Sequence, residues 1–210
     1  MVIEFEKEYL SELYYEGKCN DKKHRFQPQV IRNYVKRIVT LAEALNVEAL
    51  YPLNSLNYEV LTGSKKDISS IRIDKQYRLE FKISTTDSEP IITICSIIDI
   101  TNNKNSMSNL GYSFIPVHPG EIIKEELQSR GISQKRFAEV VGVSYTMLND
   151  ILNGRRPVST DFALLIEAAT NINAEMLMNM QTRYNMQIAR KDKNVIAHLE
   201  NLRKICATLL

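Results

Sequence analysis

Two short helices joined by a tight turn at a glycine are the feature that most constrains the fold of this chain. Ser133 is placed to cap the first helix and Ser144 the second, because serine is a preferred residue before the first helical turn. The apolar positions recur at helical spacing: Phe137, Ala138 and Val141 in the first helix, and Leu148, Ile151 and Leu152 in the second. The small Ala138 lets the helices cross closely, and Gly142 permits a backbone conformation that a side chain disfavours. The segment 132–153 therefore predicts two helices packed across a tight turn.

The spacing from Ala138 to Gly142 to Leu148 is typical of a helix-turn-helix motif, although an ordinary helical hairpin is an alternative. In that motif the second helix enters the major groove and its exposed residues near the N-terminus reach base edges. The residues at those positions are Tyr145, Thr146 and Asn149. Asparagine can form two hydrogen bonds with adenine, and threonine can contact a thymine methyl group. The motif thus predicts DNA reading by a repressor.

A second set of residues at helix ends and in the following loop is predicted to hold DNA phosphate. These residues are Ser133, Gln134, Ser144, Asn153, Arg155 and Arg156. Helix ends commonly bind phosphate through side chains and backbone N–H groups, and such contacts set affinity more than sequence choice. The alternative for the two arginines is a solvated basic pair. The net charge of +2 is too small to indicate a nucleic-acid partner, so any such surface is local.

The rest of the chain divides into an α+β domain over 1–104, a linker over 105–112 and an all-α domain over 113–210. The polar stretch 101–108 lacks periodicity and marks the boundary. Before it, the pattern predicts strands at 1–5, 68–73, 77–83 and 91–98, and helices at 6–16 and from Pro28, giving two helices and an antiparallel sheet. After it, further helices are predicted at 120–130, 161–169, 174–190 and 195–209. Met107 in the boundary would make a start codon, so two joined gene products remain an alternative to a natural fusion.

The composition does not indicate a cofactor-binding, metal-binding or membrane protein. The 3 Cys and 3 His are scattered without ligand spacing, so we expect no disulfide framework, zinc site or cofactor. The longest apolar runs, such as Ile91–Ile98, are too short to span a bilayer, and no signal peptide follows Met1. We therefore expect a cytoplasmic protein without a membrane partner. Helix-turn-helix proteins usually bind as two-fold dimers, so a homodimer through the C-terminal half is also expected.

The C-terminal half resembles a known family in two segments. VHPGEIIKEEL (117–127) and ISQKRFAEVVGVSYTMLNDILNGRRPVSTDFALLIEAA (132–169) are similar to HigA antitoxins, a branch of the Xre-type helix-turn-helix proteins. The resemblance covers nearly all of 107–210. It implies an antitoxin that neutralises a partner toxin and represses its own operon.

The N-terminal half resembles HigB toxins of the RelE/ParE superfamily. The resemblance rests on ISSIRIDKQYRLEFKI (68–83), on the preceding LNSL (53–56) and on the following Ile97-Ile98-Asp99. It implies a RelE-like fold and a ribosome-dependent mRNA endonuclease, with ribosome and mRNA as partners. The residues that it suggests for catalysis or RNA binding are Arg72, Arg78, Lys65, Tyr77 and Asp99.

The chemistry of RNA cleavage assigns roles to these residues. Arg72 and Arg78 would clamp phosphate, because a guanidinium binds two oxygens at once, and Tyr77 would stack on a base or fill the sheet. Relatives commonly end the sheet with Asp-Tyr-His, whereas this chain reads Asp99-Ile100-Thr101. The acid–base role could then pass to Asp99, to a lysine such as Lys65, or to His24.

Taken together, the two resemblances predict a toxin that is tethered to its antitoxin. The antitoxin inhibits the toxin and binds operator DNA. The alternative is a DNA-binding regulator whose N-terminal domain is non-catalytic and blocks a partner, as gyrase-blocking ParE-type relatives do.

Overall fold

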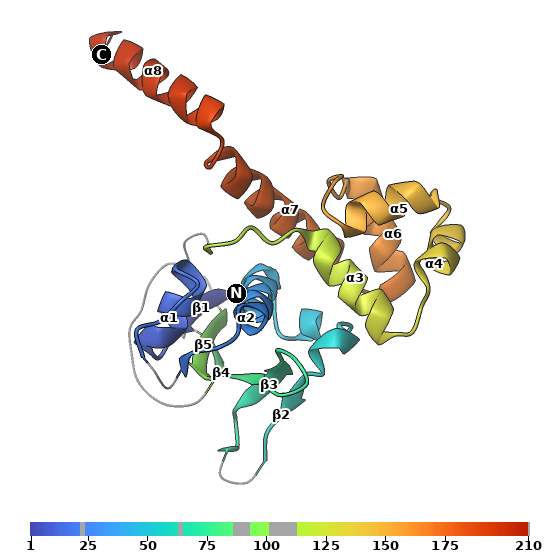
Figure 1. Cartoon of the computed structure of the whole chain (residues 1–210). Helices are drawn as coiled ribbons and strands as arrows, with labels where there is room; N and C mark the ends of the chain where they lie inside the picture. The colour runs from blue at the N-terminus through green and yellow to red at the C-terminus, as the bar shows by residue number, and fades with distance from the viewer. Residues whose placement is uncertain (22–23, 63–64, 86–92, 101–112, 210) are drawn as a thin grey trace.

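The computed structural model describes residues 1–21, 24–62, 65–85, 93–100 and 113–209. The N-terminal domain contains β1 (Val2–Phe5), α1 (Glu8–Tyr15), α2 (Pro28–Glu43), the 3₁₀ turns η2 (Glu48–Leu50) and η3 (Asn54–Leu56), β2 (Glu59–Val60), β3 (Ser69–Arg72), β4 (Arg78–Thr85) and β5 (Thr93–Asp99). The C-terminal domain contains α3 (Pro119–Ser129), α4 (Gln134–Val141), α5 (Tyr145–Leu152), α6 (Thr160–Thr170), α7 (Ala174–Ala189) and α8 (Lys193–Leu209). Figure 1 shows α3 lying beside the N-terminal domain, and α8 projecting away from both domains.

The sheet has the order β1-β5-β4-β3-β2, and it is mixed. β1 runs parallel to β5, with Ile3 opposite Cys95, whereas the other pairs are antiparallel. The prediction of a purely antiparallel sheet was therefore wrong. A parallel pair needs a long connection, and the whole segment between β1 and β5, including both helices, supplies it. Alternation along the sequence identifies a strand but not the direction of its neighbour. The two-residue β2 was also not predicted.

Buried side chains fill the space between the helices and the sheet of the N-terminal half. α1 and α2 pack against the sheet, and along β4 buried Leu79 and Phe81 alternate with exposed Lys82. The fully buried side chains of this core come from both helices and the sheet: Ile3, Leu10, Leu13, Tyr14, Tyr34, Ile38, Ile71, Leu79, Phe81 and Ile97. The hydroxyl of Tyr34 donates to the Leu10 carbonyl at 2.9 Å, so even the polar end of this side chain is satisfied.

The helix-turn-helix geometry predicted for 132–153 is confirmed. The Ser133 and Ser144 hydroxyls accept hydrogen bonds from the N–H groups of Arg136 (3.2 Å) and Met147 (3.1 Å). Gly142 ends α4 with φ +72°, in the left-handed region that favours glycine. The core of this domain includes Ile122, Ile123, Leu127, Phe137, Leu148, Ile151, Phe162, Ile166, Leu177 and Met180. Within the described ranges, no helix has the length and apolar character needed to cross a bilayer.

Candidate nucleic-acid interfaces

The N-terminal part of α5 presents polar side chains outward while its apolar side is buried. Tyr145 is 52% exposed and Thr146 is exposed, whereas Leu148 and Ile151 are fully buried. Asn149 is half-buried, one helical turn after Tyr145. The three residues predicted to read bases therefore lie on the outer side of α5 and its margin.

Asn149 is held by a short chain of hydrogen bonds. The Asn153 Nδ2 donates to Asn149 Oδ1 at 2.5 Å and to the Asn149 carbonyl at 2.8 Å. The Lys124 Nζ of α3 donates in turn to Asn153 Oδ1 at 2.8 Å. Asn153, predicted to contact phosphate, thus orients Asn149 in this structure. The link to Lys124 joins positions far apart in sequence, and sequence reasoning missed it.

The remaining residues predicted to contact DNA surround the exposed side of α5. Gln134 at the start of α4 lines a groove with Ser133, Lys135 and Tyr145. Arg155 and Arg156 are exposed in the loop after α5. The Arg155 guanidinium lies 3.7 Å from the Asp150 carboxylate with its side chain 71% exposed, so this weak pair leaves the arginine accessible. The Ser144 hydroxyl is already engaged in the helix cap.

In the N-terminal domain, Arg72 and Arg78 lie directly opposite each other in the β3–β4 register. Arg72 is exposed, and its side chain forms no hydrogen bond or ion pair with any other described residue. Arg78 is engaged: its guanidinium contacts Glu59 Oε1 at 2.7 Å, Ser70 Oγ at 2.6 Å and the Asn57 carbonyl at 2.9 Å. Of the two arginines, Arg72 is the one available to a ligand.

The other candidates from the N-terminal half surround the same end of the sheet. The Lys65 Nζ contacts Glu80 Oε1 at 2.6 Å, and Glu80 pairs with Asp99 across β4 and β5. The side chain of Asp99 lies outside the described part of the structure. Tyr77 is half-buried and packs edge-on against Phe26, with ring centroids 5.2 Å apart. The fold thus gathers residues that are up to 34 positions apart in sequence.

The loop after α1 brings His24 towards this end of the sheet. The His24 Nδ1 lies 2.7 Å from Asp21 Oδ2, and the imidazole stacks on Tyr9 with centroids 3.9 Å apart. The Tyr9 hydroxyl accepts a hydrogen bond from the N–H of Ile100, which directly follows β5. His24 therefore lies one aromatic ring away from the backbone that follows Asp99.

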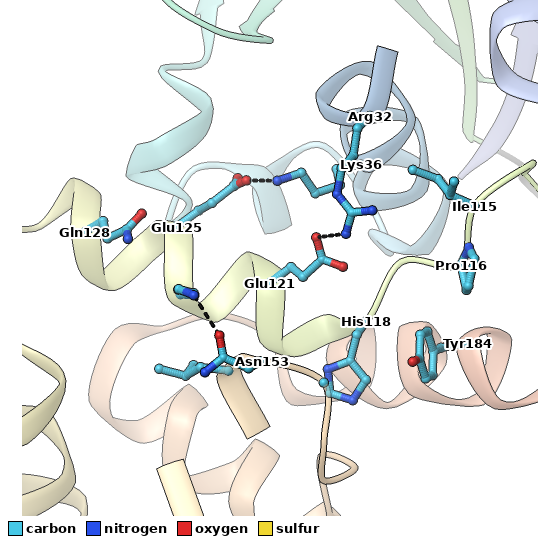
Figure 2. A pocket seen from close by; sticks show the side chains of 13 residues that line it. Arg32, Lys36, Ile115, Pro116, His118, Glu121, Glu125, Gln128, Asn153 and Tyr184 are labelled. Carbon is cyan, nitrogen blue, oxygen red and sulfur yellow. Dashed lines mark hydrogen bonds and ion pairs between the residues drawn. The ribbon is translucent and has the colours of Figure 1, made fainter. Parts of the chain in front are cut away.

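Ion pairs between α2 and α3 join the two domains, and Figure 2 shows those of Arg32 and Lys36 lining a pocket. Arg32 Nη2 contacts Glu121 Oε2 at 2.8 Å. Glu125 contacts Lys36 through Oε1 and Arg37 through Oε2, the latter at 2.8 Å. Burial would raise the pKa of Glu125, but the charges of Arg37 and Lys36 outweigh it and lower the pKa below its ordinary value. Glu125 is therefore held as a carboxylate.

Glu126 makes a buried contact between the domains. Its side chain is 1% exposed, and its two oxygens accept from the backbone N–H groups of Asn54 (2.8 Å) and Ser55 (3.0 Å) at the start of η3. Arg130 Nε donates to Glu126 Oε1 at 2.8 Å, and Arg130 Nη2 donates to the Pro52 carbonyl at 2.6 Å. Sequence reasoning missed this clamp. The only signal was a row of glutamates in an otherwise amphipathic helix.

His118 fixes the start of α3 beside the same pocket. Its Nδ1 accepts from the Gly120 N–H at 3.0 Å, and its ring packs edge-on against Tyr184. Burial lowers the pKa of His118, against an opposing effect of Glu121, so the ring is held neutral as the cap requires. In the part of the chain that the structure describes, no group of three His, Cys, Asp or Glu side chains could hold a metal ion.

The fold and the exposed side of α5 define a helix-turn-helix domain, and a helix-turn-helix family model matches residues 123–177. The chain is 36% identical over 81 residues to virulence-associated protein I of Dichelobacter nodosus, covering 38% of this chain and 75% of the relative. It is 35% identical over 83 residues to Toxin HigB-1 of Vibrio cholerae, covering 39% of this chain and 83% of the toxin.

Solved structures with sequence similarity include the Pseudomonas aeruginosa antitoxin HigA with the higBA promoter. That match has 30% identity, a TM-score of 0.34, and covers 43% of this chain and 91% of the antitoxin. The HigA-family antidote protein of Coxiella burnetii matches with 32% identity and a TM-score of 0.35, over 36% of this chain and 84% of that one. The chain belongs to the HigA-type helix-turn-helix antitoxin family of toxin-antitoxin systems.

Proposed function

We propose that this chain is a toxin and its antitoxin in one polypeptide. The C-terminal domain represses transcription by binding operator DNA, and it neutralises the N-terminal domain, a HigB-like mRNA endonuclease. One observation carries the proposal: a single chain combines a helix-turn-helix domain with similarity to a HigB toxin, and charged clamps join its two domains.

In DNA binding, α5 lies in the major groove and Asn149 reads a base. Asn153 accepts from Lys124 and donates to Asn149 Oδ1, which leaves the Asn149 amide hydrogens directed to other acceptors. A second lone pair of Oδ1 remains for adenine N6, as bidentate recognition requires. Tyr145 and Thr146 contact neighbouring bases, and Gln134, Arg155 and Arg156 bind phosphate. Two chains bind as a dimer, because two-fold half-sites double the contacts.

In RNA cleavage, Arg72 stabilises the charge that builds on the scissile phosphate, because its guanidinium is the exposed and unengaged one. Arg78 shapes the site through Glu59 and Ser70. His24, oriented by Asp21, takes the acid–base role that a terminal histidine plays in relatives, with Asp99 as the second candidate. Tyr77 lies at the margin and stacks on a base of the ribosome-bound mRNA.

A second function keeps the repressor but makes the N-terminal domain non-catalytic. Two predicted catalytic cations, Arg78 and Lys65, are engaged in ion pairs within the domain, which favours this alternative. In that case the domain blocks a protein partner such as gyrase instead of cleaving RNA.

A gel shift on DNA from upstream of the coding region tests the repressor. We expect Asn149→Ala to weaken operator binding about 5-fold to 150-fold, because a good bidentate contact contributes roughly 1–3 kcal/mol. Asn201→Ala, on the exposed side of α8, is the matched control. Unchanged binding across Tyr145, Thr146 and Asn149 substitutions would mean that another surface reads DNA.

Expression of residues 1–104 tests the nuclease, since buried side chains of α1, α2 and the sheet pack together within this part. We expect growth arrest with mRNA cleavage, which Arg72→Ala abolishes and Lys18→Ala, at an exposed loop position, does not. Growth arrest with intact mRNA would favour the gyrase-type alternative. Absence of arrest would contradict a toxin of either kind.

A further inference from the structure

Three cations on one side of α2 have no acidic partner in their own domain. Arg32, Lys36 and Arg37 pair with Glu121 and Glu125 of α3, and among the described residues no carboxylate of the N-terminal domain contacts them. The side chains of Lys36 and Arg37 are only 8% and 6% exposed. Buried cations are costly without a partner, so when α3 leaves, this surface becomes uncompensated and attracts anions.

The same surface is connected to the candidate nuclease site. Arg37 Nε donates to the Arg72 carbonyl at 2.7 Å, while its Nη1 contacts Glu125 at 2.8 Å. Arg37 therefore joins the basic side of α2 to the end of β3. The side chain of Arg72 is exposed at that end of β3.

The carboxylates that α3 supplies resemble the phosphates of an RNA backbone in charge and in hydrogen bonding. Glu121 and Glu125 lie one turn apart on the same helix side, and each offers only acceptor oxygens to guanidinium or ammonium donors. Guanidinium binds carboxylate and phosphate through the same planar geometry. Both ligands satisfy the same donors, so they compete.

We propose that Arg32, Lys36 and Arg37 form an RNA-phosphate-binding surface of the toxin domain, and that the carboxylates of α3 inhibit the toxin by occupying it in place of RNA. This inference rests on the proposed function, because it takes RNA as the ligand of the N-terminal domain. It adds a surface outside the predicted cleavage site and a competitive mode of inhibition.

The test uses the complex itself. A protease site is placed within 105–112, the purified chain is cut, and the C-terminal half is held on a resin while the N-terminal half stays bound by the interface. Single-stranded poly(A) RNA is added at constant salt, and the N-terminal half that appears in solution is measured at equilibrium. We expect RNA to release it in proportion to RNA concentration. Double-stranded operator DNA, which binds the retained half, is expected to release none.

The double variant Arg32→Ser, Lys36→Ser keeps Arg37, which also holds β3. Relative to its own release without RNA, we expect it to need about 25-fold more RNA at roughly 0.1 M salt, for two lost phosphate contacts. The paired variant Lys18→Ser, Lys82→Ser removes the same charge from exposed positions outside this surface and keeps the wild-type response. No release by RNA, or equal release from both double variants, would overturn the inference. If RNA releases the N-terminal half but this half does not cleave mRNA, the nuclease is refuted and the RNA-binding surface is retained.

Discussion

The clamp around Glu126 leads to the sharpest energetic prediction, made for the substitution Glu126→Gln. The two carboxylate oxygens accept from the N–H groups of Asn54 and Ser55 and from Arg130, and the side chain is 1% exposed. Glutamine retains one acceptor oxygen and presents an NH₂ group to a donor, so it leaves one N–H unsatisfied and Arg130 without its charge partner. Of these Glu126 contacts, only the hydrogen bonds from Asn54 and Ser55 cross between the halves, and hydrogen bonds to a charged group contribute about 1.5–3 kcal/mol.

This loss predicts a dissociation constant between the halves of the cut chain that rises about 10-fold to 150-fold. The measurement is dissociation on dilution of a fluorescently labelled complex. Glu121→Gln is the matched control: its partner Arg32 is 43% exposed, and such a pair contributes at most about 1 kcal/mol, or roughly fivefold in affinity. Equal effects of the two substitutions would refute the assignment of the clamp to Glu126.

Three further outcomes follow from α3 and its neighbours. Burial lowers the pKa of His118 below 6.5, so its contribution to folding stability is complete above pH 6.5 and is lost as the pH falls through the folded value. His118→Asn keeps an acceptor for the helix cap but does not titrate. The drop in melting temperature between about pH 7.5 and about pH 5.5 should therefore be smaller in this variant than in the wild type. Gly120→Ala would place a Cβ 2.0 Å from the Ile151 carbonyl oxygen, and urea unfolding should show a loss of about 2 kcal/mol or more. Lys124→Met removes the donor that orients Asn149 through Asn153, so the ratio of operator to non-specific DNA affinity should fall about threefold to tenfold. Lys124→Arg should restore the ratio. An unchanged ratio in Lys124→Met would show that this chain of hydrogen bonds does not affect base recognition.

Local signals in the sequence were sufficient for much of the C-terminal domain. Ser133 and Ser144 cap the helices that follow them, and Gly142 adopts the predicted left-handed conformation. Capping and helical periodicity involve residues within a few positions of each other, so the sequence pattern alone reveals them. The resemblance in this half was likewise confirmed at the level of the family.

The sequence pattern did not predict contacts between segments that are far apart in the chain. The parallel pairing of β1 with β5 joins strands about 90 residues apart, and Glu125 meets Lys36 and Arg37 across 89 and 88 positions. The ion pair between Arg78 and Glu59 likewise depends on how the sheet is ordered. Residue type showed that Arg78 could bind phosphate, and only the fold shows that its guanidinium already has partners.

The most direct test of the account maps mRNA 5′ ends on translating ribosomes, with the chain cut within 105–112. The complex with both halves bound is compared with the N-terminal half freed from α3. We expect new 5′ ends within ribosome-bound codons only for the freed half, and none when that half carries Arg72→Ala. Cleavage by the intact complex at the same rate, or no cleavage by a folded N-terminal half, would contradict the claim that one domain restrains a nuclease in the other.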